Sequence, residues 1–243
     1  MVKKHKPNYR ARRFVALLVV AIASLGGAAI ELGARNWELF PATQPIAQSE
    51  HIPAGETSAK EALATLEVKG RAPKTDYKRT QFGSGWARGA NGCDTRNAIL
   101  QRDLEQVAID EQCKVQSGML HDPYTGKEKQ FVRGPSTSAD VQIDHVVALS
   151  NAWQTGAQLL SPEVRTELAN DPQNLLAVDG SANQQKGDGD TATWLPANKN
   201  FRCAYVARQI AVKQHYTLWV TPAEKTAMER VLAQCPAQVL PTE

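Results

Sequence analysis

Residues 14–30, FVALLVVAIASLGGAAI, form an apolar run of seventeen residues without a charged side chain. Six lysines and arginines crowd the first thirteen residues, and no acidic residue accompanies them. A basic flank before an apolar run is typical of a signal peptide or of a single membrane anchor. Both alternatives place the rest of the chain outside the cytoplasm, because the basic flank stays inside. We therefore expect residues 1–34 to be a signal peptide or an N-terminal anchor in the cytoplasmic membrane.

The four cysteines agree with an extracytoplasmic location. Consecutive cysteines lie 20, 90 and 32 residues apart, and none forms a CxxC pair. An even number without the spacing of a zinc site predicts two disulfides in an exported chain. Sequence alone allows three pairings. We favour Cys93 with Cys113 and Cys203 with Cys235, because each bond would connect a local segment that contains a helix.

Composition and charge limit the remaining classes. Hydrophobic residues make up 42% of the chain and charged residues 22%, as in globular proteins. Residues 35–58 are rich in Pro, Ala, Gln and Ser without periodicity, which predicts a flexible linker before one domain at residues 59–243. Beyond the basic N-terminal cluster, the chain has 22 basic and 25 acidic residues. A broadly cationic nucleic-acid clamp is therefore excluded, and any phosphate-binding surface must be local.

Hydrophobic periodicity and turn signals predict an α+β domain that is mainly helical and has short strands. The segments 114–120 and 128–133 flank HDPYTG, whose Asp-Pro and Thr-Gly steps predict a hairpin turn. The residues 175–178, LLAV, suggest another short strand. Helices are expected at 59–68, from Asp94 through Val107, from Ser161 to about residue 170, from Ser181, across 199–216 and from the capping box TPAE at 221–224.

The stretch 141–153, VQIDHVVALSNAW, changes its period in the middle. Val141 and Ile143 alternate with a polar residue, as in a half-buried strand, whereas the residues from Val147 onward follow helical spacing. Asp144 and His145 therefore stand at a strand-to-helix junction. An acid and a histidine at such a junction are the residue types that metal-assisted hydrolysis requires, provided that other segments supply partners.

The segment DPQNLLAVDGSANQQKGD supplies candidate partners. Asn174 precedes the short strand and Asn183 lies in the following helix. The order of strand, strand and helix, with Asp-His on the first strand and Asn on the helix, resembles the ββα-metal motif of HNH endonucleases. The segments CDTRNAIL, DPYTG, DHVVALSNAW, DPQNLLAV, NQQKGD and WLP with a following CAYV are similar to the exported members of that superfamily, of the GmrSD-type C-terminal HNH domain. The implied fold is a ββα-metal core embedded in a mainly helical domain.

The resemblance also implies roles. His145 would be the general base, because a neutral imidazole can accept a proton from water near neutral pH. Asp144 and Asn183 would bind one divalent cation, Mg²⁺ or Mn²⁺, through oxygen atoms. Asn174 would brace the loop that orients His145. The expected activity rises with pH as His145 loses its proton and then levels off.

Three basic residues are candidates for contacts with substrate phosphate. Lys186 lies about one turn beyond Asn183, while Arg96 and Lys199 occupy matching positions in the pattern. Two features differ from the compact version of the HNH motif. In this chain 29 residues separate His145 from Asn174, and Asn183 stands where that motif has its final histidine. The second departure favours oxygen-preferring metals.

The resulting interpretation is an extracytoplasmic, metal-dependent endonuclease that hydrolyses DNA with low sequence specificity. Nucleic acid is the expected partner, with DNA favoured over RNA, and contact with a membrane is expected only through an uncleaved N-terminal segment. A ribonuclease of the same mechanism and a non-catalytic envelope binding protein remain alternatives. A zinc-dependent hydrolase is disfavoured, because four of the five histidines lie outside the motif.

Overall fold

The computed structural model describes residues 56–89 and 92–242, all within a unit that spans residues 50–243. The apolar run 14–30 and the expected linker up to residue 55 lie outside the described residues. None of the helices in the described ranges combines the length and apolar character that a membrane crossing requires.

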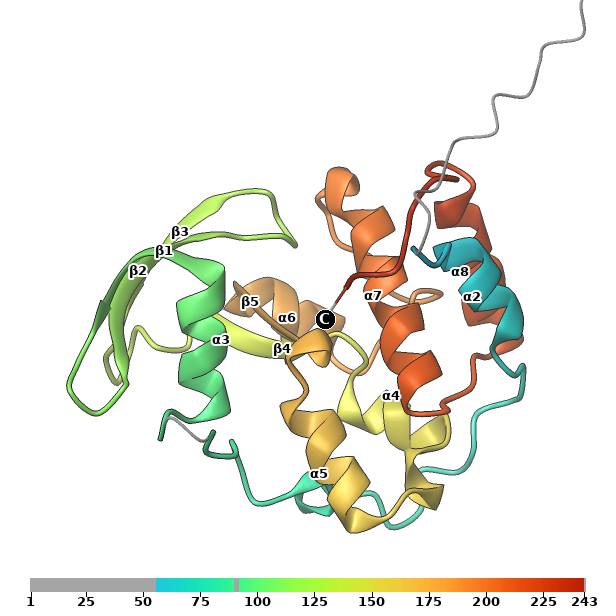
Figure 1. Cartoon of the computed structure of the whole chain (residues 1–243), viewed down its shortest axis with the longest axis horizontal. Helices are drawn as coiled ribbons and strands as arrows, with labels where there is room; N and C mark the ends of the chain where they lie inside the picture. Colours follow the sequence, from blue (N-terminus) through green and yellow to red (C-terminus); the bar gives the residue numbers. More distant parts are fainter. Residues whose placement is uncertain (1–55, 90–91, 243) are drawn as a thin grey trace, which may run out of the picture. The chain divides into compact units, whose positions relative to one another are not determined.

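The described residues form an α+β architecture of seven α-helices and two small antiparallel sheets (Figure 1). This agrees with the expected α+β class. With η denoting 3₁₀ helices, the elements in chain order are α2 (Ala59–Thr65), η1 (Arg79–Phe82), α3 (Thr95–Asp103), β1 (Leu104–Ile109), β2 (Val115–His121), β3 (Glu128–Val132), β4 (Val141–His145), α4 (Leu149–Gln154), η2 (Ala157–Leu159), α5 (Pro162–Asn170), η3 (Pro172–Asn174), β5 (Leu175–Asp179), α6 (Gly180–Lys186), η4 (Lys199–Phe201), α7 (Arg202–His215) and α8 (Pro222–Leu232).

The first sheet is a meander in the order β1-β2-β3. The hairpin expected around HDPYTG is confirmed as β2 and β3, which pair from Ser117 opposite Val132 to His121 opposite Glu128. The expectation that the helix after Asp94 continues through Val107 is wrong. Helix α3 ends at Asp103 and the chain becomes β1, because pairing with β2 prevails over the helical spacing of the apolar residues.

The second sheet consists of β4 and β5, and α6 follows β5 directly. The strands pair antiparallel from Val141 opposite Asp179 to His145 opposite Leu175. A Cβ atom on Gly180 would lie only 2.2 Å from the Ala139 carbonyl oxygen, so a glycine is needed where α6 begins. The N-cap of α6 is Asp179 and not Ser181 as expected, since the Asp179 carboxylate accepts the hydrogen bond of the Ala182 amide.

The β4–β5 pair is buried on both faces, which fixes its place in the domain. Leu175 and Ala177 belong to a hydrophobic cluster with α3 and the meander, whereas Leu176 and Val178 belong to a cluster with α2, α7 and α8. Figure 1 shows β4, β5 and α6 between α3 and α7. A third cluster joins η1, α4 and α5 to the end of α7. The end of β4, where Asp144 and His145 lie, is therefore held by packing on two sides.

Local capping signals and both expected disulfides are confirmed. The Ser161 hydroxyl accepts from the Val164 amide at the start of α5, and Thr221 with Glu224 forms the capping box of α8. Cys93 is bonded to Cys113, next to the start of α3. Cys203 in α7 is bonded to Cys235 after α8. The disulfides therefore connect the segments around α3 and around α7, as the sequence predicted.

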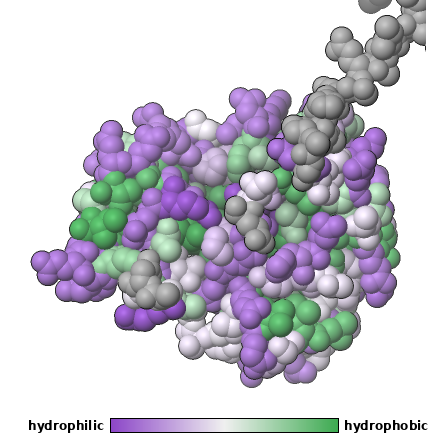
Figure 2. Space-filling model, in the orientation of Figure 1, coloured by the Kyte–Doolittle hydropathy of each residue, from purple (hydrophilic) through white to green (hydrophobic). Residues whose placement is uncertain are grey.

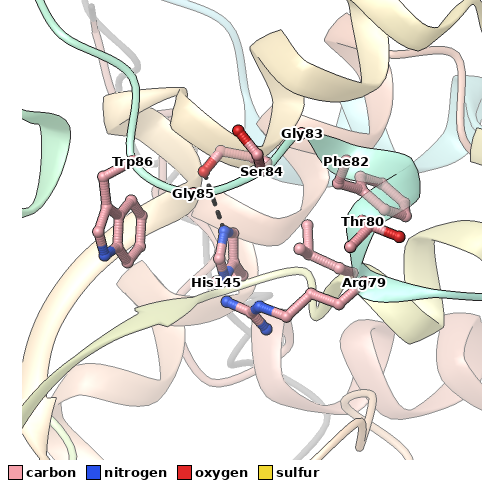
Figure 3. Close-up of a pocket in the computed structure, with 10 residues that line it drawn as sticks. Arg79, Thr80, Phe82, Gly83, Ser84, Gly85, Trp86 and His145 are labelled. Carbon is pink, nitrogen blue, oxygen red and sulfur yellow. Dashed lines mark hydrogen bonds between the residues drawn. The ribbon is translucent and has the colours of Figure 1, made fainter.

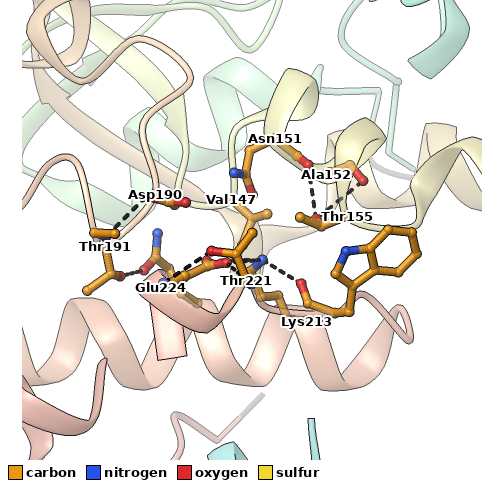
Figure 4. A network of polar contacts seen from close by, with 12 residues as sticks. Val147, Asn151, Ala152, Thr155, Asp190, Thr191, Lys213, Thr221 and Glu224 are labelled. Atoms are coloured by element: carbon orange, nitrogen blue, oxygen red, sulfur yellow. Dashed lines mark hydrogen bonds and ion pairs between the residues drawn. The ribbon is translucent and has the colours of Figure 1, made fainter. Parts of the chain in front are cut away.

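A buried polar network joins α7 to α8 (Figure 4). The Lys213 ammonium is fully buried, lies 3.0 Å from a Glu224 carboxylate oxygen and donates to the Trp219 carbonyl at 2.9 Å. Burial raises the pKa of Glu224, and the nearby Lys213 opposes that rise. These contacts pair two opposite charges that would be more costly inside the domain if they were separate.

The face seen in Figure 2 is hydrophilic over most of its area and carries hydrophobic residues in small separate patches. Large exposed hydrophobic side chains among the described residues are Val68, Ile109, Val132 and Leu159. Isolated apolar residues of this kind are ordinary on a protein surface and do not by themselves mark a docking site.

Candidate active site

The C-terminal end of β4 opens on a pocket of about 390 Å³. Asp144 and His145 leave opposite faces of the strand, as successive strand residues must, yet both line this pocket because it spans the strand end. Helix α6 supplies Asn183. The complete lining is Arg79, Arg96, Gln142, Ile143, Asp144, His145, Ala148, Leu149, Asn183 and Gly187. We call this the polar pocket.

The His145 ring is held in one orientation. Its Nε2 lies 2.9 Å from the Ala169 carbonyl oxygen, which can only accept, so the ring proton is on Nε2 (dashed line in Figure 3). The half-buried Trp86 ring stacks on it, with centroids 5.7 Å apart and planes 7° apart. Burial lowers the pKa of His145 to about 3, and the Arg79 and Lys186 cations act in the same direction. His145 is therefore neutral near pH 7, and Nδ1 carries the lone pair that can accept a proton.

Asp144 is buried and has two polar neighbours. The Tyr124 hydroxyl donates to its Oδ2, and the Lys186 ammonium lies 3.0 Å from Oδ1 and 2.9 Å from Oδ2. Burial raises the pKa of Asp144, while Lys186 and the Tyr124 hydroxyl oppose the rise. The carboxylate is thus fixed in place before any ligand arrives.

The position of Lys186 differs from the expected one. Its side chain is fully buried, and its Nζ also donates to the His145 carbonyl at 2.8 Å. The ammonium is directed inward by these contacts and does not line the polar pocket. The expectation of a direct phosphate contact therefore needs correction: in this structure Lys186 positions Asp144 and the end of β4.

The oxygen atoms around the polar pocket suit a hard divalent cation. The Asn183 Nδ2 donates to Gln142 Oε1 at 2.9 Å, which leaves the Asn183 amide oxygen free for another partner. Within the described ranges no group of three His, Cys, Asp or Glu side chains forms a metal-binding cluster. Mg²⁺ commonly uses one or two protein oxygens and keeps several waters, so Asp144 with Asn183 fits Mg²⁺ better than Zn²⁺.

Asn174 is completely buried beneath the loop that follows His145. Its Oδ1 accepts from the Val147 amide at 2.8 Å, and its Nδ2 donates to the Leu168 carbonyl at 3.2 Å. Its backbone carbonyl accepts from the Val146 amide at 2.7 Å. Contacts of this kind hold the loop in one conformation, and Asn174 itself does not line the polar pocket.

Two arginines line the pocket, and the sequence pattern drew attention to only one of them. Arg96 donates through Nη2 to the Ser138 and Val141 carbonyls, which anchors its guanidinium at the pocket wall. Arg79, from η1, is exposed, and its guanidinium has no hydrogen bond or ion pair within the described part of the chain. Figure 3 shows Arg79 extending toward His145. Lys199 is exposed on η4 and does not line the polar pocket.

Comparison with known proteins gives a consistent result. Residues 94–231 match the family model described as GmrSD restriction endonucleases, C-terminal domain. An uncharacterized secreted protein of Arthroderma benhamiae (strain ATCC MYA-4681 / CBS 112371) is 37% identical over 193 residues, which cover 79% of this chain and 91% of the relative. No solved structure matches the chain.

These matches confirm two expectations from the sequence. The extracytoplasmic location is supported by the secreted relative and by the two disulfides. The matched segment begins at the N-cap of α3 and extends into α8, so it contains β4, β5 and α6 together with every residue that lines the polar pocket except Arg79. The chain belongs to the family of the C-terminal domain of GmrSD restriction endonucleases.

Proposed function

We propose that this protein is an extracytoplasmic endonuclease that hydrolyses phosphodiester bonds in DNA with low sequence specificity and with the help of one divalent cation. Family membership supports an endonuclease-related domain. The observation that carries the finer proposal is the orientation of His145, whose Nε2–H is committed to Ala169 while Nδ1 remains a proton acceptor in a pocket with two arginines. We assign the catalytic domain to residues 59–243.

In this proposal His145 acts as the general base. Its Nδ1 accepts the proton of the attacking water, the new P–O bond forms, and the opposite P–O bond breaks. The leaving oxygen then takes a proton from solvent. Burial lowers the pKa of His145, so the imidazole is unprotonated near neutral pH and can accept this proton without first losing one.

Asp144 and Asn183 are the residues that would hold Mg²⁺ or Mn²⁺. A bound cation would supply positive charge to the phosphate and the leaving oxygen. Lys186 and Tyr124 orient the Asp144 carboxylate, and Asn174 holds the loop behind His145. The β4, β5 and α6 elements would then act as a ββα-metal core.

Arg79 and Arg96 are the candidates for binding the phosphate. Both line the polar pocket beside His145, and guanidinium groups can donate two parallel hydrogen bonds to phosphate oxygens. Arg79 has the more available guanidinium, because Arg96 already donates to two carbonyls. Such contacts do not distinguish bases, which agrees with low sequence specificity.

The test is cleavage of plasmid DNA and of structured RNA by the protein, produced with both disulfides formed, in Mg²⁺, Mn²⁺, Zn²⁺ or EDTA. We expect plasmid cutting in Mg²⁺ or Mn²⁺ that EDTA abolishes and that His145→Ala reduces at least 100-fold. His121→Ala is the matched control, since His121 is an exposed histidine of β2 that does not line the polar pocket.

Each outcome has a defined meaning. Preferential cutting of RNA would assign the same mechanism to a ribonuclease. Cutting that survives His145→Ala would contradict the assignment of the base. A folded protein that cuts neither polymer with any of the metals would leave a binding role for the domain.

A further inference from the structure

A second pocket adjoins His145 and has no role in the proposed reaction. Its volume is about 210 Å³, and it shares Arg79, His145 and Leu149 with the polar pocket (Figure 3). Its other lining residues are Thr80, Phe82, Gly83, Ser84, Gly85, Trp86 and Ala169. We call it the aromatic pocket. His145 therefore stands in the wall between two cavities of different chemistry.

The walls of the aromatic pocket suit a flat ring. Phe82, Leu149 and Ala169 are buried and provide apolar surface. Trp86 is half-buried, so part of its indole remains accessible while the ring stacks on His145. Apolar and aromatic walls of this kind favour a planar, weakly hydrated group over a phosphate or a sugar.

The rim of the aromatic pocket offers polar groups. Thr80 and Ser84 are exposed residues, and their hydroxyls make no hydrogen bond within the described ranges. A hydroxyl can both donate and accept, so it can pair with either kind of atom on the edge of a ring. A flat ring with donors and acceptors on its edge is the chemical description of a nucleobase.

The loop that forms this pocket is held in place. Gly83 has a φ of +95°, which favours glycine, and the position of a Cβ on this residue would lie 3.2 Å from the Thr166 side chain of α5. The Arg165 guanidinium of α5 donates to the Gln81 carbonyl at 2.9 Å. The chain from Arg79 to Trp86 is thereby tied to α5 beside His145.

We propose that the aromatic pocket receives one unstacked nucleobase from a nucleotide next to the cleaved phosphate. This inference rests on the proposed nuclease function. A phosphate held between Arg79 and Arg96 in the polar pocket would place its neighbouring nucleotide at the wall formed by His145. A paired base is stacked on both faces and must leave the duplex before it can enter a walled cavity. The preferred substrate is therefore single-stranded or locally unpaired nucleic acid.

The first experiment measures binding without cleavage. Calorimetry in EDTA would compare thymidine 3′,5′-bisphosphate with the bisphosphate of the same sugar lacking the base. We expect the nucleotide to bind about 5- to 150-fold more tightly, the range typical of one base stacked on an aromatic side chain. Trp86→Leu should remove this difference and Trp86→Phe should keep most of it. Equal affinity for the two bisphosphates, or binding of neither, would overturn the inference.

The second experiment uses the unaltered protein and therefore does not depend on a variant that folds. One oligonucleotide would be supplied with Mg²⁺ or Mn²⁺ as a single strand and as a duplex. We expect the single strand to be cut at least about fivefold faster, because unpairing a base costs free energy. Equal or faster cutting of the duplex would overturn the inference.

The two proposals can fail separately. Metal-dependent cutting of plasmid DNA together with equal binding of the two bisphosphates would leave the nuclease assignment and reject the base pocket. Tighter binding of the nucleotide without cleavage of any polymer would keep the pocket as a nucleotide site and reject the nuclease assignment.

Discussion

The Nε2 atom of His145 lies 2.9 Å from the carbonyl oxygen of Ala169, 24 residues along the chain in α5. This contact fixes the tautomer and the ring orientation of the proposed base. It also explains how the long segment between β4 and β5 takes part in the site, since α5 supplies the carbonyl that holds the His145 ring.

The pH dependence of the activity is the most direct consequence. With the pKa of His145 lowered to about 3, its Nδ1 is already unprotonated at pH 5, so the activity should not rise with a midpoint near 6.5. This differs from the profile that an unperturbed histidine predicts. The measurement is kcat/KM at pH 4.5 to 8.5 with saturating Mg²⁺ or Mn²⁺. A rise with a midpoint near 6.5 that no other group explains would contradict a buried, neutral His145.

The free energy of unfolding should also depend on pH through the protonation of His145. The unfolded chain binds a proton to His145 below about pH 6.5, whereas the folded chain does so only near pH 3, so stability is lost as pH falls through this window. The contribution of one such group is up to about 1.4 kcal/mol per pH unit. Urea unfolding at pH 7, 6, 5 and 4 should show a shallower loss in His145→Ala than in the parent. His121→Ala, which removes an exposed histidine, is the matched control. The prediction would be refuted if the free energy of unfolding fell equally with pH in His145→Ala and in the parent.

Asn174→Ala should reduce both stability and turnover. The change removes a buried acceptor for the Val147 amide and a donor to the Leu168 carbonyl, which should cost about 1–3 kcal/mol of unfolding free energy. Because the loop behind His145 loses its support, kcat should fall about 10- to 100-fold while KM changes little. Denaturant melts and steady-state kinetics would measure the two effects.

Asn198→Ala provides the control for this prediction. Asn198 also makes side-chain hydrogen bonds, to the Pro123 carbonyl and from the Asn200 amide, but it lines neither pocket at His145. It should lower stability without lowering kcat. Equal effects of the two variants on kcat would mean that Asn174 acts only through general stability.

The parts of the fold that the sequence predicted well are those with local chemical signals. The Ser161-Pro162 start of α5 and the Thr221 to Glu224 box of α8 depend on side chains within one helical turn of the backbone groups they satisfy. The turn at HDPYTG depends similarly on Asp122, whose carboxylate accepts from the amides of Tyr124 and Thr125. Such contacts require no knowledge of distant segments.

The parts that the sequence did not predict depend on distant contacts. Leu104 and Val107 fit the spacing of α3, and only pairing with β2 makes their segment a strand. Asp179 and Ser181 are both acceptable caps in isolation. The choice of Asp179 agrees with its ion pair to Lys129, 50 residues away on β3.

The same distinction applies to the candidate site. Asp144, His145 and Asn183 could be predicted because they lie on neighbouring elements with a recognisable order, and all three line the polar pocket. Arg79 stands outside that order, in a 3₁₀ helix that is brought to the pocket by packing against α5. No local signal in the sequence could have placed its side chain beside His145.

Lys186→Met tests the structural role assigned to the buried lysine. The variant leaves the Asp144 carboxylate buried with the Tyr124 hydroxyl but without a cation, and breaking such a pair typically costs about 3–5 kcal/mol. Lys186 opposes the rise in the pKa of Asp144, so its removal should raise that pKa further. The deficit in unfolding free energy relative to the parent should therefore be larger at pH 7 than at pH 5, because protonation of Asp144 increases as pH falls and removes the charge that needs the cation.

Urea unfolding at the two pH values would measure the effect of Lys186→Met, with Lys74→Met as the matched control. Lys74 pairs with Asp188 at 3.1 Å, but both side chains are about half exposed, so its loss should cost about 1 kcal/mol or less. The double variant Asp144→Asn with Lys186→Met should recover part of the lost stability, because it buries no charge at this position. A loss for Lys186→Met no larger than that for Lys74→Met, or one unchanged between pH 7 and pH 5, would show that the ammonium does not stabilise the Asp144 carboxylate.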